Sequence, residues 1–81
     1  MLRAAGHPAR RRQDWPAGLT AREVEVLRLL ARGHSNREIA ERLFISRKTA
    51  SNHVEHIYTK IDAANRAQAS VFALKHGLMQ A

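Results

Sequence analysis

The side chains best suited to chemistry in this sequence lie at helical spacing between residues 46 and 61. If this range forms a helix, one side of it carries polar groups of mixed type, namely Lys48, Ser51, Asn52, Glu55, His56 and Thr59. Asparagine can form two hydrogen bonds with adenine, lysine can reach a guanine edge or a phosphate, and glutamate can accept from the N4 amine of cytosine. This mixture suits the reading of base edges better than simple solubility, so it indicates double-stranded DNA as a partner.

Other kinds of functional site have weaker support. His53 and His56 stand three residues apart and could share a metal, but no third ligand of suitable type is nearby. We expect His53 to be half-buried against the preceding helix. The sequence contains no cysteine, which excludes a disulfide framework and a thiolate zinc site, and neither a catalytic pair nor a glycine-rich phosphate loop occurs. We therefore expect no enzyme activity, no metal and no cofactor.

The composition describes one small, basic domain. Among 81 residues, 14 lysines and arginines stand against 7 aspartates and glutamates, which gives a formal net charge of +7. Such an excess favours a polyanionic partner, either nucleic acid or an acidic membrane surface. The apolar runs are short and interrupted by charge, so the sequence predicts no membrane-spanning segment, no secretory signal and no membrane partner.

The sequence changes character near Gly18. Residues 1–18 contain two prolines and two glycines, no helical periodicity, and four arginines against Asp14, a net of +3. We interpret this segment as a flexible basic arm or interdomain linker, which is either a solvated piece of a longer protein or an arm that touches phosphate or a minor groove. The domain itself then covers residues 19–81 and carries the remaining +4.

Helix signals recur at short intervals after residue 18. Two Ser/Thr capping boxes and two simpler caps mark the predicted helix starts, at Thr20, Ser35, Ser46 and Asn65. With the intervening stop signals they predict four helices, over residues 20–31, 35–43, 46–61 and 65–76. The expected centre of their shared core consists of Leu27, Leu30, Ile39, Leu43, Ile45, Val54 and Ile57. The fold class is therefore expected to be all-α, a compact four-helix domain.

The second and third predicted helices are joined by a very short turn, Phe44-Ile45-Ser46. A short helix, a tight turn and a longer helix are typical of the helix-turn-helix motif, in which the first helix lies across the DNA backbone and the second enters the major groove. The range 46–61 is accordingly the candidate for major-groove recognition.

The last predicted helix has apolar side chains on more than one side. Some of its small and aromatic residues can complete the core, which leaves Val71, Leu74 and Lys75 on another side. These residues either form the contact between two protomers of a homodimer, or the apolar ones finish the core of a single chain. The sequence does not separate the two interpretations.

Residues 19–78 also resemble a known family. The resemblance is carried by the runs 19–27 (LTAREVEVL), 35–40 (SNREIA) and 65–67 (NRA), and by Gly33, Leu43, Ile45-Ser46, Thr49, His53-Val54, Ile57-Tyr58 and Lys60. At these positions the sequence is similar to the LuxR-type, GerE-like DNA-binding domain, the C-terminal output domain of bacterial transcription regulators.

The resemblance implies a sequence-specific, double-stranded DNA-binding domain. In such a domain the third helix reads the major groove, and the fourth pairs two protomers on a two-fold-symmetric site. The resemblance further implies a cytoplasmic protein at the bacterial nucleoid, with an N-terminal regulatory domain in a longer native chain.

The resemblance also implies site residues, which are assigned by their positions in the family pattern. The family's base-reading positions correspond to Ser51, Asn52 and Glu55, and its phosphate-contacting positions to Arg37, Thr49 and Lys60. We add Lys48 to the first group and Arg47 to the second. The predicted base-reading set is then Lys48, Ser51, Asn52 and Glu55. The predicted phosphate-contacting set is Arg37, Arg47, Thr49 and Lys60.

The sequence departs from the family pattern at three positions. Ala50 stands where a β-branched residue is usual and Asp62 where glycine is frequent, so the packing and the turn there are expected to differ slightly. Glu55 stands where basic or neutral residues are common, and it either specifies a C·G pair or weakens binding and makes dimerisation more necessary. The alternative hypothesis is a protein-interaction or dimerisation module with weak or vestigial DNA binding.

Overall fold

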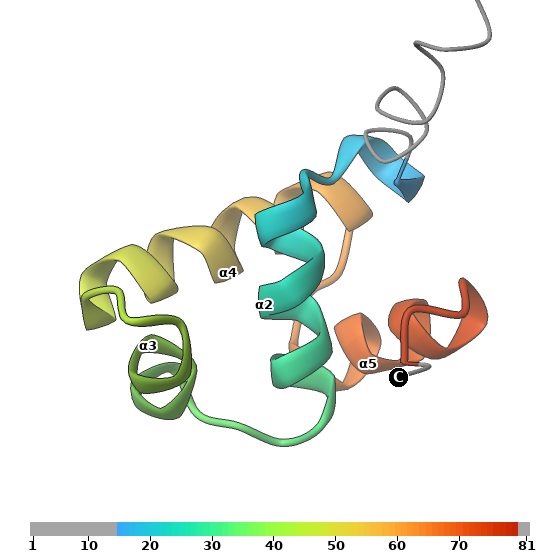
Figure 1. The fold of residues 1–81 in the computed structure, drawn as a ribbon. Coiled ribbons are helices and arrows are strands. Elements are labelled where there is room, and N and C mark those ends of the chain that lie inside the picture. The colour runs from blue at the N-terminus through green and yellow to red at the C-terminus, as the bar shows by residue number, and fades with distance from the viewer. Residues whose placement is uncertain (1–14, 80–81) are drawn as a thin grey trace, which may run out of the picture.

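The computed structural model describes residues 15–79, which form four α-helices after a short 3-10 turn (Figure 1). The elements are η1 (Pro16–Gly18), α2 (Ala21–Ala31), α3 (Asn36–Leu43), α4 (Arg47–Ile61) and α5 (Arg66–Lys75). This part of the chain contains no strand, so the predicted all-α fold is confirmed. The arginine-rich stretch of the predicted arm, residues 3–12, lies outside the described residues.

Each helix begins one residue after the cap that the sequence marks. The hydroxyl of Thr20 accepts a hydrogen bond from the backbone N–H of Glu23 (3.1 Å), and the Glu23 carboxylate accepts one from the N–H of Thr20 (2.9 Å). Ser35 and Glu38 form the second capping box in the same way, and the predicted caps of α4 and α5 are also formed. The predicted helix starts are therefore confirmed. They were predictable because a cap acts within one turn of helix.

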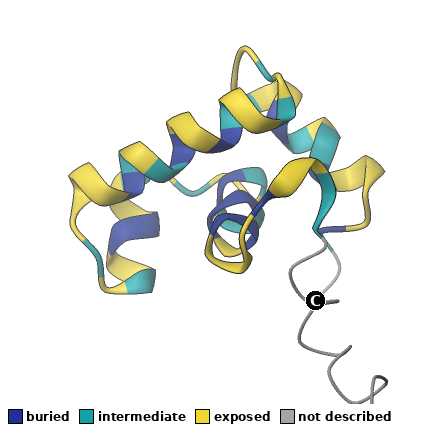
Figure 2. Ribbon diagram, turned by 90° about the horizontal axis from the view of Figure 1, so that it is seen from above, coloured by how far each residue is buried: buried dark blue, intermediate teal, exposed yellow. Residues whose placement is uncertain are grey.

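Like α4, helix α2 contacts each of the other three helices. The longest helix, α4, crosses it on one side; α3 packs mainly against α4, and α5 mainly against α2 (Figure 1). Figure 2 shows α4 buried along the side that faces the core and exposed along its outer side. None of the described helices is long and apolar enough to cross a membrane.

Apolar residues from all four helices fill a single core. Five of the predicted central residues are buried as expected: Leu27, Leu30, Ile39, Val54 and Ile57. The same prediction was wrong for Leu43 and Ile45, which are only partly buried, because the end of α3 and the turn after it lie at the edge of the fold. The remaining buried apolar residues are Leu19, Val24, Val26, Ala40, Ala50, Ala69, Ala73 and Leu78.

Two helices end in the left-handed conformation without a glycine. Phe44 ends α3 with a φ of 58°, and Asp62 ends α4 with the same φ. Aspartate tolerates this conformation better than other non-glycine residues, whereas a bulky phenylalanine is strained in it. Asp62 therefore gives the turn after α4 the shape that a glycine would favour.

Two arginine side chains form hydrogen bonds with backbone segments that are distant in the sequence. Arg66 Nη1 donates to the carbonyl of Leu30, near the end of α2, at 2.7 Å. Arg28 Nε donates to the carbonyl of Leu78 at 2.7 Å, and its guanidinium lies 5.9 Å from the centre of the Trp15 ring. Both guanidinium groups thus donate to carbonyls that lie near or beyond the end of a helix and lack the usual donor four residues on. The bond from Arg66 also links α5 to α2.

Candidate nucleic-acid interface

The start and the orientation of α4 are fixed locally. The Ser46 hydroxyl accepts a hydrogen bond from the backbone N–H of Thr49 (3.0 Å) and donates one to the Thr49 hydroxyl (2.9 Å). Ala50, Val54 and Ile57 then bury one side of the helix in the core. Because packing holds that side, the direction of the opposite side is also set.

The outer side of α4 carries the predicted base-reading residues Lys48, Ser51, Asn52 and Glu55, here termed the recognition face. Lys48, Asn52 and Glu55 are exposed, and Ser51 is half-buried. Within residues 15–79, the side chains of Lys48, Asn52 and Glu55 take part in no hydrogen bond or ion pair. The structure therefore brings all four residues to one surface, where three of them are available to a partner.

Ser51 is the member of the recognition face that contacts another helix. Asn36 Nδ2 donates to Ser51 Oγ at 3.4 Å, a long hydrogen bond that joins the start of α3 to α4. The sequence reasoning assigned no role to Asn36. One signal could have found it: Asn36 is a polar residue in line with the apolar stripe of Ile39, Ala40 and Leu43, and that stripe faces the neighbouring helix.

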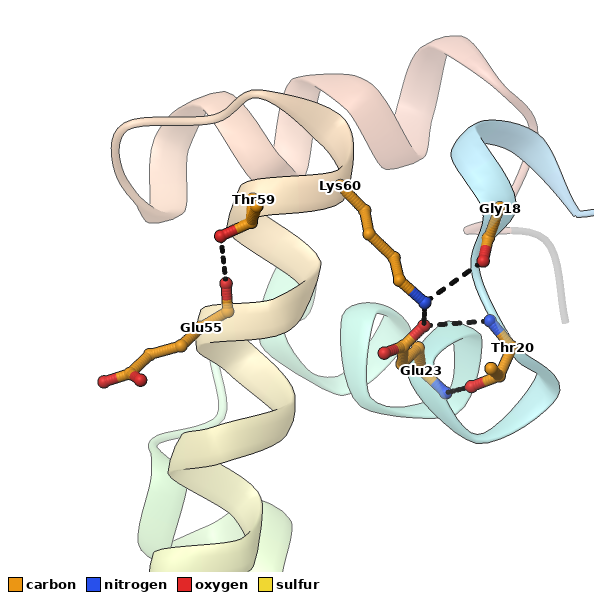
Figure 3. Close-up of polar contacts among 6 residues, drawn as sticks. All are labelled: Gly18, Thr20, Glu23, Glu55, Thr59 and Lys60. Carbon is orange, nitrogen blue, oxygen red and sulfur yellow. Dashed lines mark hydrogen bonds and ion pairs between the residues drawn. The ribbon is translucent and has the colours of Figure 1, made fainter.

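Glu55 points away from the protein (Figure 3). The hydroxyl of Thr59 donates to the backbone carbonyl of Glu55 at 3.1 Å, so it does not hold the carboxylate. Thr59 thereby binds within α4, whereas the carboxylate of Glu55 stays at the surface.

Three of the predicted phosphate-contacting residues are exposed and lie in the first turns of α3 and α4: Arg37, Arg47 and Thr49. Arg37 lies in the first turn of α3, and its Nε is 3.4 Å from Glu41 Oε2 in an exposed ion pair. Such surface pairs contribute little in water, so the guanidinium can exchange Glu41 for a phosphate. Arg47 and Thr49 lie in the first turn of α4.

The fourth residue of that set, Lys60, is also exposed, but its ammonium is bound by other parts of the domain. Its Nζ donates to Glu23 Oε1 at 2.7 Å and to the carbonyl of Gly18 at 3.1 Å (Figure 3). The Glu23 side chain is only 7% exposed and that of Lys60 34%. In Figure 3, Lys60 and Glu55 point to opposite sides of α4. The structure thus places the Lys60 ammonium at the start of α2 and apart from the recognition face.

Glu23 takes part both in the capping box of α2 and in the pair with Lys60. Burial by itself raises the pKa of the Glu23 carboxyl, but the hydrogen bonds from Lys60 and from the Thr20 N–H together outweigh burial, so that the pKa lies below its ordinary value of 4.5. The carboxylate is therefore charged at neutral pH and holds the lysine. Sequence reasoning missed this pair because residues 37 positions apart produce no periodic signal.

The predicted dimer residues lie on the outer side of α5. Val71 is 58% exposed, Leu74 is 67% exposed, and Lys75 is also exposed. Ala69 and Ala73 fill the inner side of the same helix. The interpretation that Val71 and Leu74 finish the core of a single chain was therefore wrong, because small residues already do so.

The two histidines of α4 differ in exposure. His53 is half-buried as expected, and His56 is exposed. Among residues 15–79, no three histidine, aspartate or glutamate side chains gather closely enough to hold a metal ion. The chemistry that this surface offers is hydrogen bonding and charge.

Comparison with known proteins identifies a family. Residues 17–73 match the family of bacterial regulatory proteins described as the luxR family. The chain is 50% identical over 60 residues to the uncharacterized transcriptional regulatory protein YhcZ of Bacillus subtilis, and 45% identical over 62 residues to the response regulator protein VraR of Staphylococcus aureus. These alignments cover 74% and 76% of this chain but only 28% and 30% of the relatives. The similarity therefore spans less than a third of each of those longer proteins.

Proposed function

Since the chain belongs to the LuxR family of DNA-binding bacterial transcription regulators, we propose that α4 reads base edges in the major groove of double-stranded DNA. The observation that carries the proposal is the recognition face, where Lys48, Asn52 and Glu55 are exposed and have no partner among residues 15–79. Polar side chains that satisfy one another are not available to bases, whereas these three are.

Each residue of the recognition face has a distinct role in this proposal. Asn52 forms two hydrogen bonds with an adenine, Lys48 binds a guanine edge or a nearby phosphate, and Ser51 contacts either base type through its hydroxyl. Because Ser51 is also bonded to Asn36, its position relative to α3 is restricted. Glu55 supplies the only negative charge on this face.

Phosphate contacts orient the domain on the duplex. α3 lies across the backbone with Arg37, while Arg47 and Thr49 bind phosphates beside the first turn of α4. Lys60 is left out of this set because Glu23 and Gly18 hold its ammonium. Lys60 instead supports binding indirectly, by holding the end of α4 against the start of α2.

Two protomers pair through α5 on a two-fold-symmetric site. Val71 and Leu74 offer exposed apolar area, and Lys75 lies beside them. In a two-fold contact the same patch meets itself, and Ala-rich surroundings allow two such helices to approach closely. Because this patch is small, we expect the homodimer to form on DNA, where both recognition faces are engaged together.

The domain acts as the output part of a longer regulator. The relatives' matched segments make up less than a third of their length, which leaves room in such proteins for an N-terminal regulatory domain. The place of action is the bacterial nucleoid in the cytoplasm.

Selection of bound duplexes from a random pool, followed by binding measurements on the selected and a scrambled duplex, tests the proposal. We expect tighter binding of the selected duplex, a steep loss of affinity with salt, and a relaxed base preference in Asn52→Ala. Thr59→Ala is the matched control, since it removes a polar group of the same helix that is bonded to the backbone.

Equal affinity for selected and scrambled duplexes, unchanged in Asn52→Ala, would contradict the proposal. A domain that dimerises through α5 but binds no duplex at low salt would instead favour a protein-interaction module, for which the exposed Val71 and Leu74 are the supporting observation.

A further inference from the structure

Glu55 differs from every other glutamate in the described part of the chain. Four glutamates have a hydrogen-bonded or charged partner: Glu23 with Lys60, Glu25 with Arg22, Glu38 with the Ser35 N–H, and Glu41 with Arg37. Within residues 15–79, the carboxylate of Glu55 has none. An unpartnered carboxylate in the middle of a proposed DNA-binding surface requires an explanation.

No cation stands one helical turn before or after Glu55 on its side of α4. Ser51 and Asn52 precede it by four and three residues, and Tyr58 and Thr59 follow at the same spacing; none of these side chains carries a positive charge. Thr59 uses its hydroxyl on the backbone carbonyl, and the carboxylate extends outward (Figure 3). The carboxylate of Glu55 is therefore not paired with any side chain one turn away on α4.

A bare carboxylate in the major groove is repelled by phosphates unless it accepts a hydrogen bond from a base. Two bases present donors there, the N4 amine of cytosine and the N6 amine of adenine. Beside the adenine amine lies N7, an acceptor that repels a carboxylate, whereas beside the cytosine amine lies a C–H group. Cytosine is therefore the base that compensates the charge of Glu55.

We propose that Glu55 makes this domain specific for a cytosine with a free N4 amine, close to the adenine that Asn52 reads. The two residues are three positions apart, which corresponds to about 4.5 Å along a helix axis. Since base pairs are spaced by about 3.4 Å, the cytosine lies within about two base pairs of the adenine. This inference rests on the proposed function, since it assigns one base to a member of the recognition face.

The experiment compares the 81-residue wild-type chain with Glu55→Ala and Glu25→Ala. Glu25→Ala is the matched control, because it removes the same charge from an exposed glutamate on α2. Each protein is titrated with the duplex selected by the wild type, with the same duplex carrying thymine in place of the assigned cytosine, and with one carrying N4-methylcytosine there. In a Watson–Crick pair, the remaining N4 hydrogen faces guanine, and the methyl group occupies the position that Glu55 would contact.

We expect wild type and Glu25→Ala to lose about tenfold or more in affinity, or about 1.4 kcal/mol, on either change of the cytosine. Glu55→Ala should bind all three duplexes with affinities that differ by less than about twofold, and should bind scrambled DNA more tightly than wild type does because a repulsive charge is gone.

Two outcomes would overturn the inference. If Glu55→Ala binds every duplex more tightly but keeps the wild-type preference for cytosine, the carboxylate is only repulsive, while the proposed function survives. If wild type, Glu25→Ala and Glu55→Ala all remain folded by circular dichroism and none binds any duplex at low salt, the proposed function fails as well.

Discussion

The two ends of α4 use polar side chains in opposite ways. In the N-terminal two-thirds of the helix, Asn52 and Glu55 extend from the surface without a partner among residues 15–79, whereas at the C-terminal end the ammonium of Lys60 is bound to the Glu23 carboxylate. Helical spacing alone does not distinguish them. What lies opposite each side chain, solvent or an element from elsewhere in the chain, decides whether the residue stabilises the fold or is available to DNA.

The largest expected effect comes from breaking the C-terminal end. Lys60→Met keeps most of the apolar stem but leaves the buried Glu23 carboxylate without its cation. We expect the free energy of unfolding to fall by about 2 kcal/mol, as measured by urea denaturation. Lys75→Met, at an exposed lysine of α5, is the control and should change it by less than about 0.5 kcal/mol. Equal losses in the two variants would mean that the Glu23 pair has no special importance.

At the N-terminal end we expect a smaller effect on stability, together with a separate effect on DNA binding. Asn52→Ala should weaken binding to the selected duplex by about 1–3 kcal/mol, because two hydrogen bonds to adenine are lost. Its free energy of unfolding should stay the same or rise by up to about 0.5 kcal/mol, because alanine is the better helix former. Fluorescence anisotropy and urea denaturation on the same preparation measure both. A loss of stability like that of Lys60→Met would remove the contrast between the two ends.

The two left-handed turns that flank α4 extend the comparison to the backbone. Phe44 is 94% exposed, so Phe44→Gly loses little packing and relieves the strain of a bulky residue at positive φ. We expect the relief of strain to raise the free energy of unfolding by about 1 kcal/mol. The added freedom of the unfolded chain offsets part of this gain. Asp62→Gly, at the same φ, should gain only about 0.3 kcal/mol because aspartate already tolerates this conformation. A larger gain at Asp62 than at Phe44 would show that strain does not decide the difference.

The last prediction concerns the pH dependence of the Lys60 contribution to stability. The folded pKa of Glu23 is lowered, so the stability that its charge provides is fully present above 4.5 and is lost as the pH falls through the lowered value. The stability difference between wild type and Lys60→Met should therefore shrink between about pH 5 and about pH 3. The hydrogen bond from the Ser35 N–H lowers the pKa of Glu38 as well, but this contribution is the same in both proteins and cancels. A constant difference over this range would contradict the assignment to Glu23.

Local signals predicted the helices because caps and apolar stripes act within a few residues. Thr20 and Ser35 form the capping boxes that their spacing to Glu23 and Glu38 indicates. The core prediction failed where position in the fold mattered more than hydrophobicity, as at Leu43 on the edge of the molecule.

The candidate site shows the same contrast between local and long-range determinants. The spacing of Asn52 and Glu55 was sufficient to place them on one exposed side of α4, because their position depends on that helix alone. The internal role of Lys60 depends on Glu23, which is 37 residues away in the sequence and comes close only when α2 and α4 pack together. A resemblance to a family carries positions across, but the charge partners that each side chain meets are properties of the folded chain.

One arginine holds both ends of the described chain. Arg28 lies against the Trp15 ring and also binds the carbonyl of Leu78. In Figure 1, η1 and the C-terminal end lie on the same side of the molecule, and α3 lies on the opposite side. Both ends of the described residues therefore lie on the side away from α3. In the proposed complex, neither Trp15 nor Leu78 obstructs the approach of α3 and the first turns of α4 to a duplex.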